Sequence, residues 1–259
     1  MAYQTVFKRY ELKYLLTERQ KKCVMEAMEP CMAPDAYGRT TIRNIYFDTA
    51  DYRLARRSIE KPVYKEKLRI RSYEKASGAS PVFVELKKKY KGVVYKRRIS
   101  MPEREAMEWT TGETDRKEDS QISREIGYFL RFYGNLRPAG FLTYQREAFW
   151  GKEQKDFRIT FDRLVLFRQE DISLESDVYG ILTGQRKCGN RCGRGGSFQP
   201  CPVPVRTRYG QGNLFSVSGH GDRTCHRNGI SGICRTVYRR HVRGLPALLP
   251  WKTGAGKTG

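Results

Sequence analysis

The sequence predicts an α+β fold in which an antiparallel β-barrel forms a tunnel and helices pack on its outside. Several segments alternate apolar and charged residues, as strands with one buried face do. Lysine and arginine dominate the charged positions. Each helical segment carries one apolar stripe, which must be buried. Helices outside a curved sheet would bury these stripes and leave the charged strand faces lining the interior, which in a barrel of about eight strands admits side chains or one small ligand.

The alternation is clearest from Lys65 to Arg71, which reads Lys-Glu-Lys-Leu-Arg-Ile-Arg. Because strand side chains alternate between two faces, its cations share one face, while Leu68 and Ile70 share the other. Other segments repeat the pattern. Their polar faces hold Arg9, Glu11 and Lys13; Glu85, Lys87 and Lys89; Lys96 and Arg98; Tyr144 and Arg146; and Arg158, Thr160 and Asp162.

The first part of the chain predicts two strands and two helices. Thr17 and Gln20 have the spacing of a capping box, which indicates a helix start. Pro30 follows the expected end of that helix. In chain order we expect a strand over residues 3–14, a helix over 17–29, a strand over 43–48 and a short helix over 51–57.

A meander, two helices and two more strands complete the predicted elements. Gly78 and Gly92 fall in the expected turns of the meander. The longer helix is indicated by apolar residues at helical spacing, from Ile122 through Ile126 to Tyr133. The expected strands are 63–74, 81–89, 92–100, 139–149 and 156–168, and the expected helices are 103–109 and 120–133.

The competing interpretation of the charged faces is an ordinary sheet with one face in water. It loses support because several strands repeat the same arginine- and lysine-rich face. A tunnel of cations would be costly unless water and an anion entered with them. Phosphate oxygens suit this role, because arginine binds them at two points and lysine adds a compact charge. Glu11 and Glu85 could pair with the cations or hold a divalent metal through oxygen ligands.

Charge is distributed unevenly along the 259 residues, whose net charge is +22. Residues 1–183 hold 36 Lys+Arg and 27 Asp+Glu, whereas residues 184–259 hold 14 and 1. We therefore divide the chain into a domain over 1–183, which lacks its final strands, and an aberrant basic tail over 184–259, which we expect to be disordered. The fold is thus expected to be incomplete at its C-terminus.

Three interpretations of the tail remain open. A zinc module would use Cys188, Cys192, Cys201 and either Cys225 or His226, but the spacing matches no paired zinc knuckle. A basic arm could bind nucleic acid. The interpretation we favour is a shifted reading frame that begins near residues 181–186, because acidic residues and strand or helix patterns disappear together there.

Membrane insertion and secretion are not indicated by the sequence. No apolar run approaches the roughly 20 residues that span a bilayer. The segment that begins at Met1 has no apolar signal core, so the cytoplasm is the expected compartment. Nucleic-acid binding, which the charge alone suggests, would require aromatics interleaved with the cations. Tyr and Phe instead alternate into the apolar face or lie on helix stripes, so no specific nucleic-acid partner is expected.

Five segments together resemble a known family. They are Phe7-Lys8-Arg9-Tyr10-Glu11-Leu12-Lys13-Tyr14, Leu68-Arg69-Ile70-Arg71, Phe83-Val84-Glu85-Leu86-Lys87, Tyr144-Gln145-Arg146 and Phe157-Arg158-Ile159-Thr160-Phe161-Asp162. In this order and spacing, over about residues 3–180, they are similar to the VTC domain. This is the polyphosphate polymerase branch of the CYTH and triphosphate tunnel metalloenzyme superfamily.

The resemblance implies a tunnel that binds ATP and polyphosphate with Mn²⁺ or Mg²⁺ and passes the γ-phosphate of ATP to a polyphosphate chain. By position it implies catalytic, phosphate-gripping roles for Arg69, Arg71, Lys87, Arg146 and Arg158. Further phosphate-binding residues would be Lys13, Lys67, Lys96, Arg98 and Tyr144. Glu11 and Glu85 would be the candidate ligands of the metal ion. A membrane protein is a conceivable partner, and the sequence indicates no oligomeric state.

The sequence departs from the family after residue 180. The family implies a further strand with a Glu-x-Lys element and a late Ser-Lys-Tyr-like motif, and neither is found in this sequence. The implied polymerase could therefore be inactive as written. Two alternatives remain, namely hydrolysis of tripolyphosphate or an organic triphosphate, and non-catalytic binding of polyphosphate. The lack of histidine before residue 184 argues against histidine-based acid–base chemistry.

Overall fold

The computed structural model describes residues 6–60, 62–114, 120–154, 156–183 and 213–219. Its helices are α1 (Glu18–Met28), α2 (Arg53–Ile59), α3 (Glu103–Thr111) and α4 (Gln121–Tyr133). Its strands are β1 (Val6–Leu16), β2 (Met32–Asp48), β3 (Tyr64–Ser72), β4 (Pro81–Tyr90), β5 (Val93–Pro102), β6 (Arg137–Gly151), β7 (Arg158–Arg168), β8 (Ile181–Leu182) and β9 (Asn213–Gly219).

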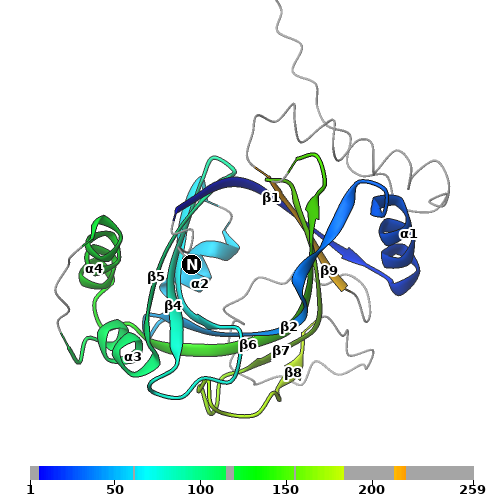
Figure 1. Ribbon diagram of the computed structural model, residues 1–259. Coiled ribbons are helices and arrows are strands. Elements are labelled where there is room, and N and C mark those ends of the chain that lie inside the picture. The colour runs from blue at the N-terminus through cyan, green and yellow to red at the C-terminus, as the bar shows by residue number, and fades with distance from the viewer. Residues whose placement is uncertain (1–5, 61, 115–119, 155, 184–212, 220–259) are drawn as a thin grey trace, which may run out of the picture.

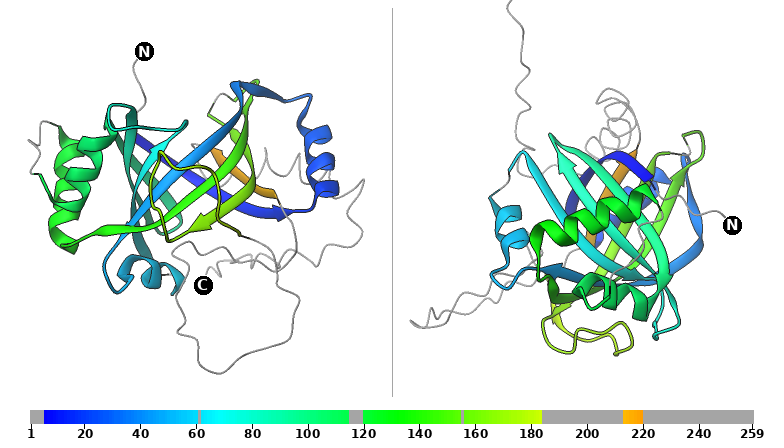
Figure 2. Two further views of the ribbon diagram at one scale, coloured as in Figure 1. Left: turned by 90° about the horizontal axis from the view of Figure 1, so that it is seen from below. Right: turned by 90° about the vertical axis from the view of Figure 1, so that its left-hand side faces the viewer.

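The strands form one antiparallel sheet that curves around an interior (Figure 1). The strand order is β6-β2-β3-β4-β5-β1-β9-β7-β8, and β6 also pairs with β7. Helices α1, α3 and α4 lie outside the sheet, whereas α2 lies over one end of the interior (Figures 1 and 2). The predicted fold class, an α+β fold with an antiparallel sheet and helices packed on it, is therefore confirmed.

The main hydrophobic core lies between the outer face of the sheet and helices α3 and α4. Leu68 and Ile70 of β3 are fully buried in it, as their alternation with the cations predicts. Trp109 of α3 and Phe129 of α4 pack in the same cluster. A second cluster packs α1 against β7, where Met28 contributes from the helix. Because the apolar faces of the strands are buried against the outer helices, the opposite, charged faces point toward the interior.

Local signals explain where several elements begin. The capping box of α1 is present, with the Gln20 backbone N–H donating to Thr17 Oγ1 at 3.3 Å and the Thr17 N–H donating to Gln20 Oε1 at 2.9 Å. Lys91 and Gly92 have φ values of 45° and 88°, as a tight hairpin turn between β4 and β5 requires. The buried Asp48 carboxylate accepts backbone N–H groups of α2 and so fixes the start of that helix.

The structure differs from the predicted elements at three places. Strand β2 begins at Met32 rather than near residue 43, because its pairing with β6 continues across a register shift between Pro34 and Arg39. The short strand β8 was not predicted. Strand β9 was also not predicted, although it pairs with both β1 and β7.

Most of the segment after residue 183 lies outside the described residues, including all residues of the zinc module that was one of the three interpretations of the tail. The expected disorder and the reading-frame shift remain predictions, as does the division of the chain at 183. Among the described helices, none combines the length and the apolar character needed to cross a membrane.

Candidate functional site

Strand register gathers the predicted cations into rows on the interior face. Residues directly opposite each other on paired strands share a face. Lys67, Lys87 and Lys96 lie opposite one another across β3, β4 and β5. The neighbouring row consists of Arg69, Glu85 and Arg98.

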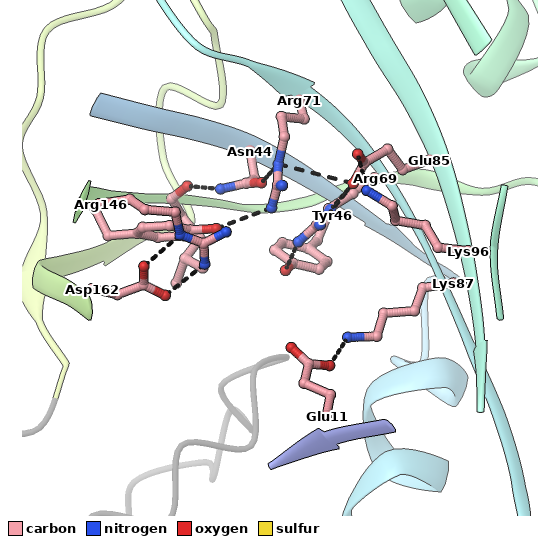
Figure 3. Close-up of polar contacts among 12 residues, drawn as sticks. Glu11, Asn44, Tyr46, Arg69, Arg71, Glu85, Lys87, Lys96, Arg146 and Asp162 are labelled. Carbon is pink, nitrogen blue, oxygen red and sulfur yellow. Dashed lines mark hydrogen bonds and ion pairs between the residues drawn. The ribbon is translucent and has the colours of Figure 1, made fainter. Parts of the chain in front are cut away.

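Glu85 is the centre of the first cluster of interior charges (Figure 3). It is fully buried, and its Oε2 accepts Arg69 Nε at 2.8 Å and Arg69 Nη2 at 2.6 Å. Lys96 Nζ donates to Oε1 at 3.2 Å, and Arg71 Nε lies 3.9 Å from Oε2. Burial alone would raise the pKa of Glu85, but Arg71, Arg69 and Lys96 outweigh it and hold that pKa well below its usual value. The carboxylate is therefore charged at neutral pH.

Polar partners from β2 and β6 hold the two arginines of β3. Arg71 donates from Nε to Asn44 Oδ1 and from Nη2 to Tyr144 Oη, each at 3.0 Å. Arg69 donates from Nη1 to Tyr46 Oη at 2.9 Å. Asn44 and Tyr46 lie opposite Arg71 and Arg69 in the β2–β3 pairing, so they share the interior face. Both guanidinium groups are thus oriented by neutral groups as well as by Glu85.

The predicted Arg146 forms a two-point ion pair across β6 and β7. Its Nε and Nη2 donate to the two oxygens of Asp162 at 2.6 and 2.7 Å. The guanidinium also lies over the Tyr144 ring, 5.0 Å from its centroid. Burial would lower the pKa of Arg146, but the Asp162 carboxylate raises it above its usual value. Arg146 is therefore a fixed cation in the same region as Arg71, which contacts the same tyrosine.

A second cluster of charges lies around Glu11. Lys87 Nζ donates to Glu11 Oε2 at 2.5 Å, and Lys13 Nζ lies 3.5 Å from Oε1. Ser216 of β9 donates to Glu11 Oε1 at 3.5 Å. Burial, with help from nearby cations such as Lys13, lowers the pKa of Lys87 to about 8 despite its Glu11 partner. Within the described ranges, the Lys67 side chain has neither a hydrogen bond nor an ion pair, and burial lowers its pKa.

The two remaining predicted cations make contacts of their own. Arg98 lies over the Phe83 ring, 4.7 Å from its centroid. Arg158 lies over Trp150 at 4.5 Å, and its Nη2 is 3.4 Å from Asp35 Oδ2. The structure thus brings most of the predicted site residues into two clusters, around Glu85 and Glu11, and gives Arg98 and Arg158 aromatic neighbours.

Sequence reasoning missed the partners that hold the arginines. Asn44 and Tyr46 alternate on β2, so their shared face was available as a signal, but their segment was assigned only as a strand. Asp162 was placed on the polar face without a role. The cations Arg69, Lys67 and Arg71 lower the pKa of Tyr46 to about 8, although burial acts in the opposite direction. Tyr46 is consequently a titratable group of the interior that the sequence did not reveal.

The interior carboxylates do not by themselves form a metal site. In the described part of the chain, no three His, Cys, Asp or Glu residues come together as possible ligands. The oxygens of Glu85 are engaged by Arg69 and Lys96, and those of Glu11 by Lys87 and Lys13. Divalent ions favour sites where several oxygen donors are available to them. The assignment of Glu11 and Glu85 to a metal therefore remains a prediction that this donor arrangement does not support.

A curved antiparallel sheet with a cation-lined interior and helices on its outside places this chain in the class of tunnel-fold proteins. A family model described as the VTC domain matches residues 8–197, and the chain belongs to this family. The predicted family is thus confirmed. Membership of this family supports a function that involves polyphosphate or triphosphates.

Two solved structures are similar to this chain at low sequence identity. A crystal structure of a proposed adenylate cyclase from Bacillus halodurans has a TM-score of 0.51 and 14% identity, and the match covers 94% of this chain and 97% of that chain. For the Mimivirus capping enzyme triphosphatase, the TM-score is 0.37, the identity 8%, and the coverage 91% and 90%. The sequence matches none of the curated proteins with which it was compared. At 14% identity, the likeness to the Bacillus halodurans structure shows the fold and nothing further.

Proposed function

We propose that the interior of the sheet binds ATP and polyphosphate and that the γ-phosphoryl group of ATP passes to the polyphosphate chain. The observation that carries this proposal is the set of three oriented guanidinium groups, Arg69, Arg71 and Arg146, on the interior face. Arginine in a fixed orientation binds phosphate oxygens at two points. A succession of such groups suits a molecule with several linked phosphates better than a single phosphate.

The residues of the interior would act mainly by alignment and charge neutralisation. In the proposed step, a terminal oxygen of the polyphosphate chain attacks the γ-phosphorus. The bond from that phosphorus to the β–γ bridging oxygen breaks, and ADP leaves. Arg69, Arg71 and Arg146 would neutralise the equatorial oxygens, with Lys87 adding charge and Tyr144 donating a hydrogen bond. No covalent intermediate on the protein is needed.

Mn²⁺ or Mg²⁺ remains part of the proposal as the metal expected to accompany the phosphates. Bound metal would supply further neutralisation of phosphate charge. Since the described carboxylates are engaged by cations, we assign no step of the transfer to a metal. Tripolyphosphate affinity, measured once in EDTA and once with Mn²⁺, would show how strongly binding of the phosphates depends on the metal ion.

Product analysis tests the transfer. The full chain is incubated with ATP, a short polyphosphate primer and Mn²⁺ or Mg²⁺, and the products are resolved by gel electrophoresis. Lengthened polyphosphate together with ADP supports the proposal. Release of orthophosphate alone would replace it with hydrolysis of tripolyphosphate or an organic triphosphate.

Non-catalytic binding of polyphosphate is a second candidate, favoured by the composition of β9. This strand pairs with β1 and β7, yet its sequence from Asn213 to Gly219 contains no acidic residue. The carboxylate that the family resemblance implies after residue 180 is therefore lacking from the described residues of that region. A chain that binds polyphosphate but shows no turnover of ATP or tripolyphosphate with any divalent ion would establish this candidate.

The proposal extends to the cellular setting. We propose the cytoplasm as its compartment and a membrane protein as a partner. Co-purification of the full chain under low-salt conditions would identify such a partner. RNA that displaces tripolyphosphate by a wide margin would contradict the expected lack of a specific nucleic-acid partner.

A further inference from the structure

The surroundings of Glu85 differ from those expected of a metal ligand. Its side chain is fully buried, on the central strand of three that present cations. Arg69 and Arg71 reach it from β3, and Lys96 reaches it from β5. A divalent ion approaching this carboxylate would face three positive charges at short range, which opposes its binding.

The contacts of Arg69 show what Glu85 does for its neighbour. Arginine has five N–H groups arranged as a rigid fork. Arg69 uses Nε and Nη2 toward Glu85 and Nη1 toward Tyr46. These contacts fix the plane of the guanidinium group, yet Nη1 and Nη2 each keep a further N–H. Among the described residues, these two N–H groups have no further hydrogen-bond partner, so the edge of the fork that is turned away from Glu85 can receive an anion.

We propose that Glu85 is a positioning residue, an internal counter-ion that holds Arg69, Arg71 and Lys96 in the geometry that receives phosphate oxygens, rather than a metal ligand. This inference rests on the proposed function of the interior. It follows from the geometry because one carboxylate links cations of two different strands, β3 and β5, across the strand β4 that carries it. Without the carboxylate, the three cations would repel one another and lose their common orientation.

The test compares Glu85→Gln with Glu66→Gln in the full chain. Glu66 is a matched control, because it lies on the outer face of β3, where it accepts hydrogen bonds from Tyr64 and Tyr133. Both variants lose one negative charge. Tripolyphosphate affinity is measured by calorimetry, once in EDTA and once with Mn²⁺. We expect Glu85→Gln to weaken binding in EDTA by about tenfold or more and Glu66→Gln to change it by less than about twofold.

Two further comparisons separate positioning from a general loss of structure. In the Glu85→Gln background, adding Arg69→Ala should weaken binding less than it does in the wild type, because Arg69 is already misplaced. Should Glu85→Gln fail to fold, the charge-balanced pair Glu85→Gln with Lys96→Met replaces it. This pair should bind tripolyphosphate more weakly than Lys96→Met alone.

Two results would overturn the inference, and a third would remove the proposed function on which it rests. A Glu85→Gln protein that binds as tightly as the wild type in EDTA but no longer gains affinity from Mn²⁺ would make Glu85 a metal ligand and overturn the inference. Additive effects of Glu85→Gln and Arg69→Ala would also overturn it. A wild-type chain that binds no tripolyphosphate in either buffer would instead remove the proposed function of the interior, and the inference with it.

Discussion

Arg146→Ala, compared with a charge-balanced double variant, separates the contribution of Arg146 to folding from its contribution to anion binding. Arg146 makes a two-point ion pair with Asp162, whose side chain is 3% exposed. Removal of one partner of a buried pair leaves an uncompensated charge and costs about 3 kcal/mol of folding free energy, the lower end of the usual range, because Arg146 keeps some contact with solvent. Loss of one two-point phosphate contact should weaken tripolyphosphate binding by about 100-fold.

The charge-balanced variant Arg146→Met with Asp162→Asn isolates the binding effect. It removes both charges, so no carboxylate is left unpaired, and we expect urea denaturation to show most of the lost stability restored. Calorimetry should still show the weakened binding, because the guanidinium is gone. Tripolyphosphate affinity within about twofold of the wild type in either variant would refute the proposed role of Arg146. Recovery of both stability and binding in the double variant would refute the reasoning as well.

The remaining predictions concern the neighbouring cations, the pH dependence and the core. Arg69→Ala with Arg71→Ala should abolish tripolyphosphate binding in calorimetry and should also lower the urea midpoint, because both arginines neutralise a buried carboxylate; unchanged affinity would contradict the proposed site. Affinity for long polyphosphate should fall as pH rises through about 8, where Lys87 loses its positive charge and Tyr46 becomes negative. The double variant Lys87→Met with Tyr46→Phe should make polyphosphate affinity less dependent on pH. A wild-type affinity that is constant from neutral to alkaline pH would contradict the predicted pH dependence. Leu68→Ala should cost about 2–5 kcal/mol in urea denaturation, because Leu68 is fully buried between the sheet and the outer helices; a loss below about 1 kcal/mol would contradict the assigned core.

The period-two pattern was sufficient to predict the tunnel class and the faces of its strands. From Lys65 to Arg71 the sequence alternates strictly, and the structure places Leu68 and Ile70 in the outer core as expected. The capping box at Thr17 likewise predicted the start of α1. These features depend on local spacing, which a sequence displays directly.

Long-range pairing was not predictable in the same way. The early part of β2 contains Pro34 and Gly38, which read as strand breakers, yet pairing with β6 carries the strand through a register shift. Strand β9 is added between β1 and β7 from a distant part of the chain. Its place depends on contacts with partners far away in sequence, so its own seven residues gave little indication of it.

In the candidate site, too, local spacing predicted some features, whereas others depended on long-range strand pairing. Alternation predicted which cations share the interior, but it could not show that Glu85 links Arg69 to Lys96, because that requires the register of three strands. Without this register, a carboxylate among cations could be an ion-pair partner or a metal ligand. The structure shows that the Glu85 oxygens face nitrogen atoms of cations.

A crystal structure of the full chain with bound tripolyphosphate would test the central claim most directly. The account predicts phosphate oxygens inside the curved sheet, within hydrogen-bond distance of Arg69, Arg71 and Arg146. Tripolyphosphate bound only outside the sheet, or only by the basic segment after residue 183, would contradict it.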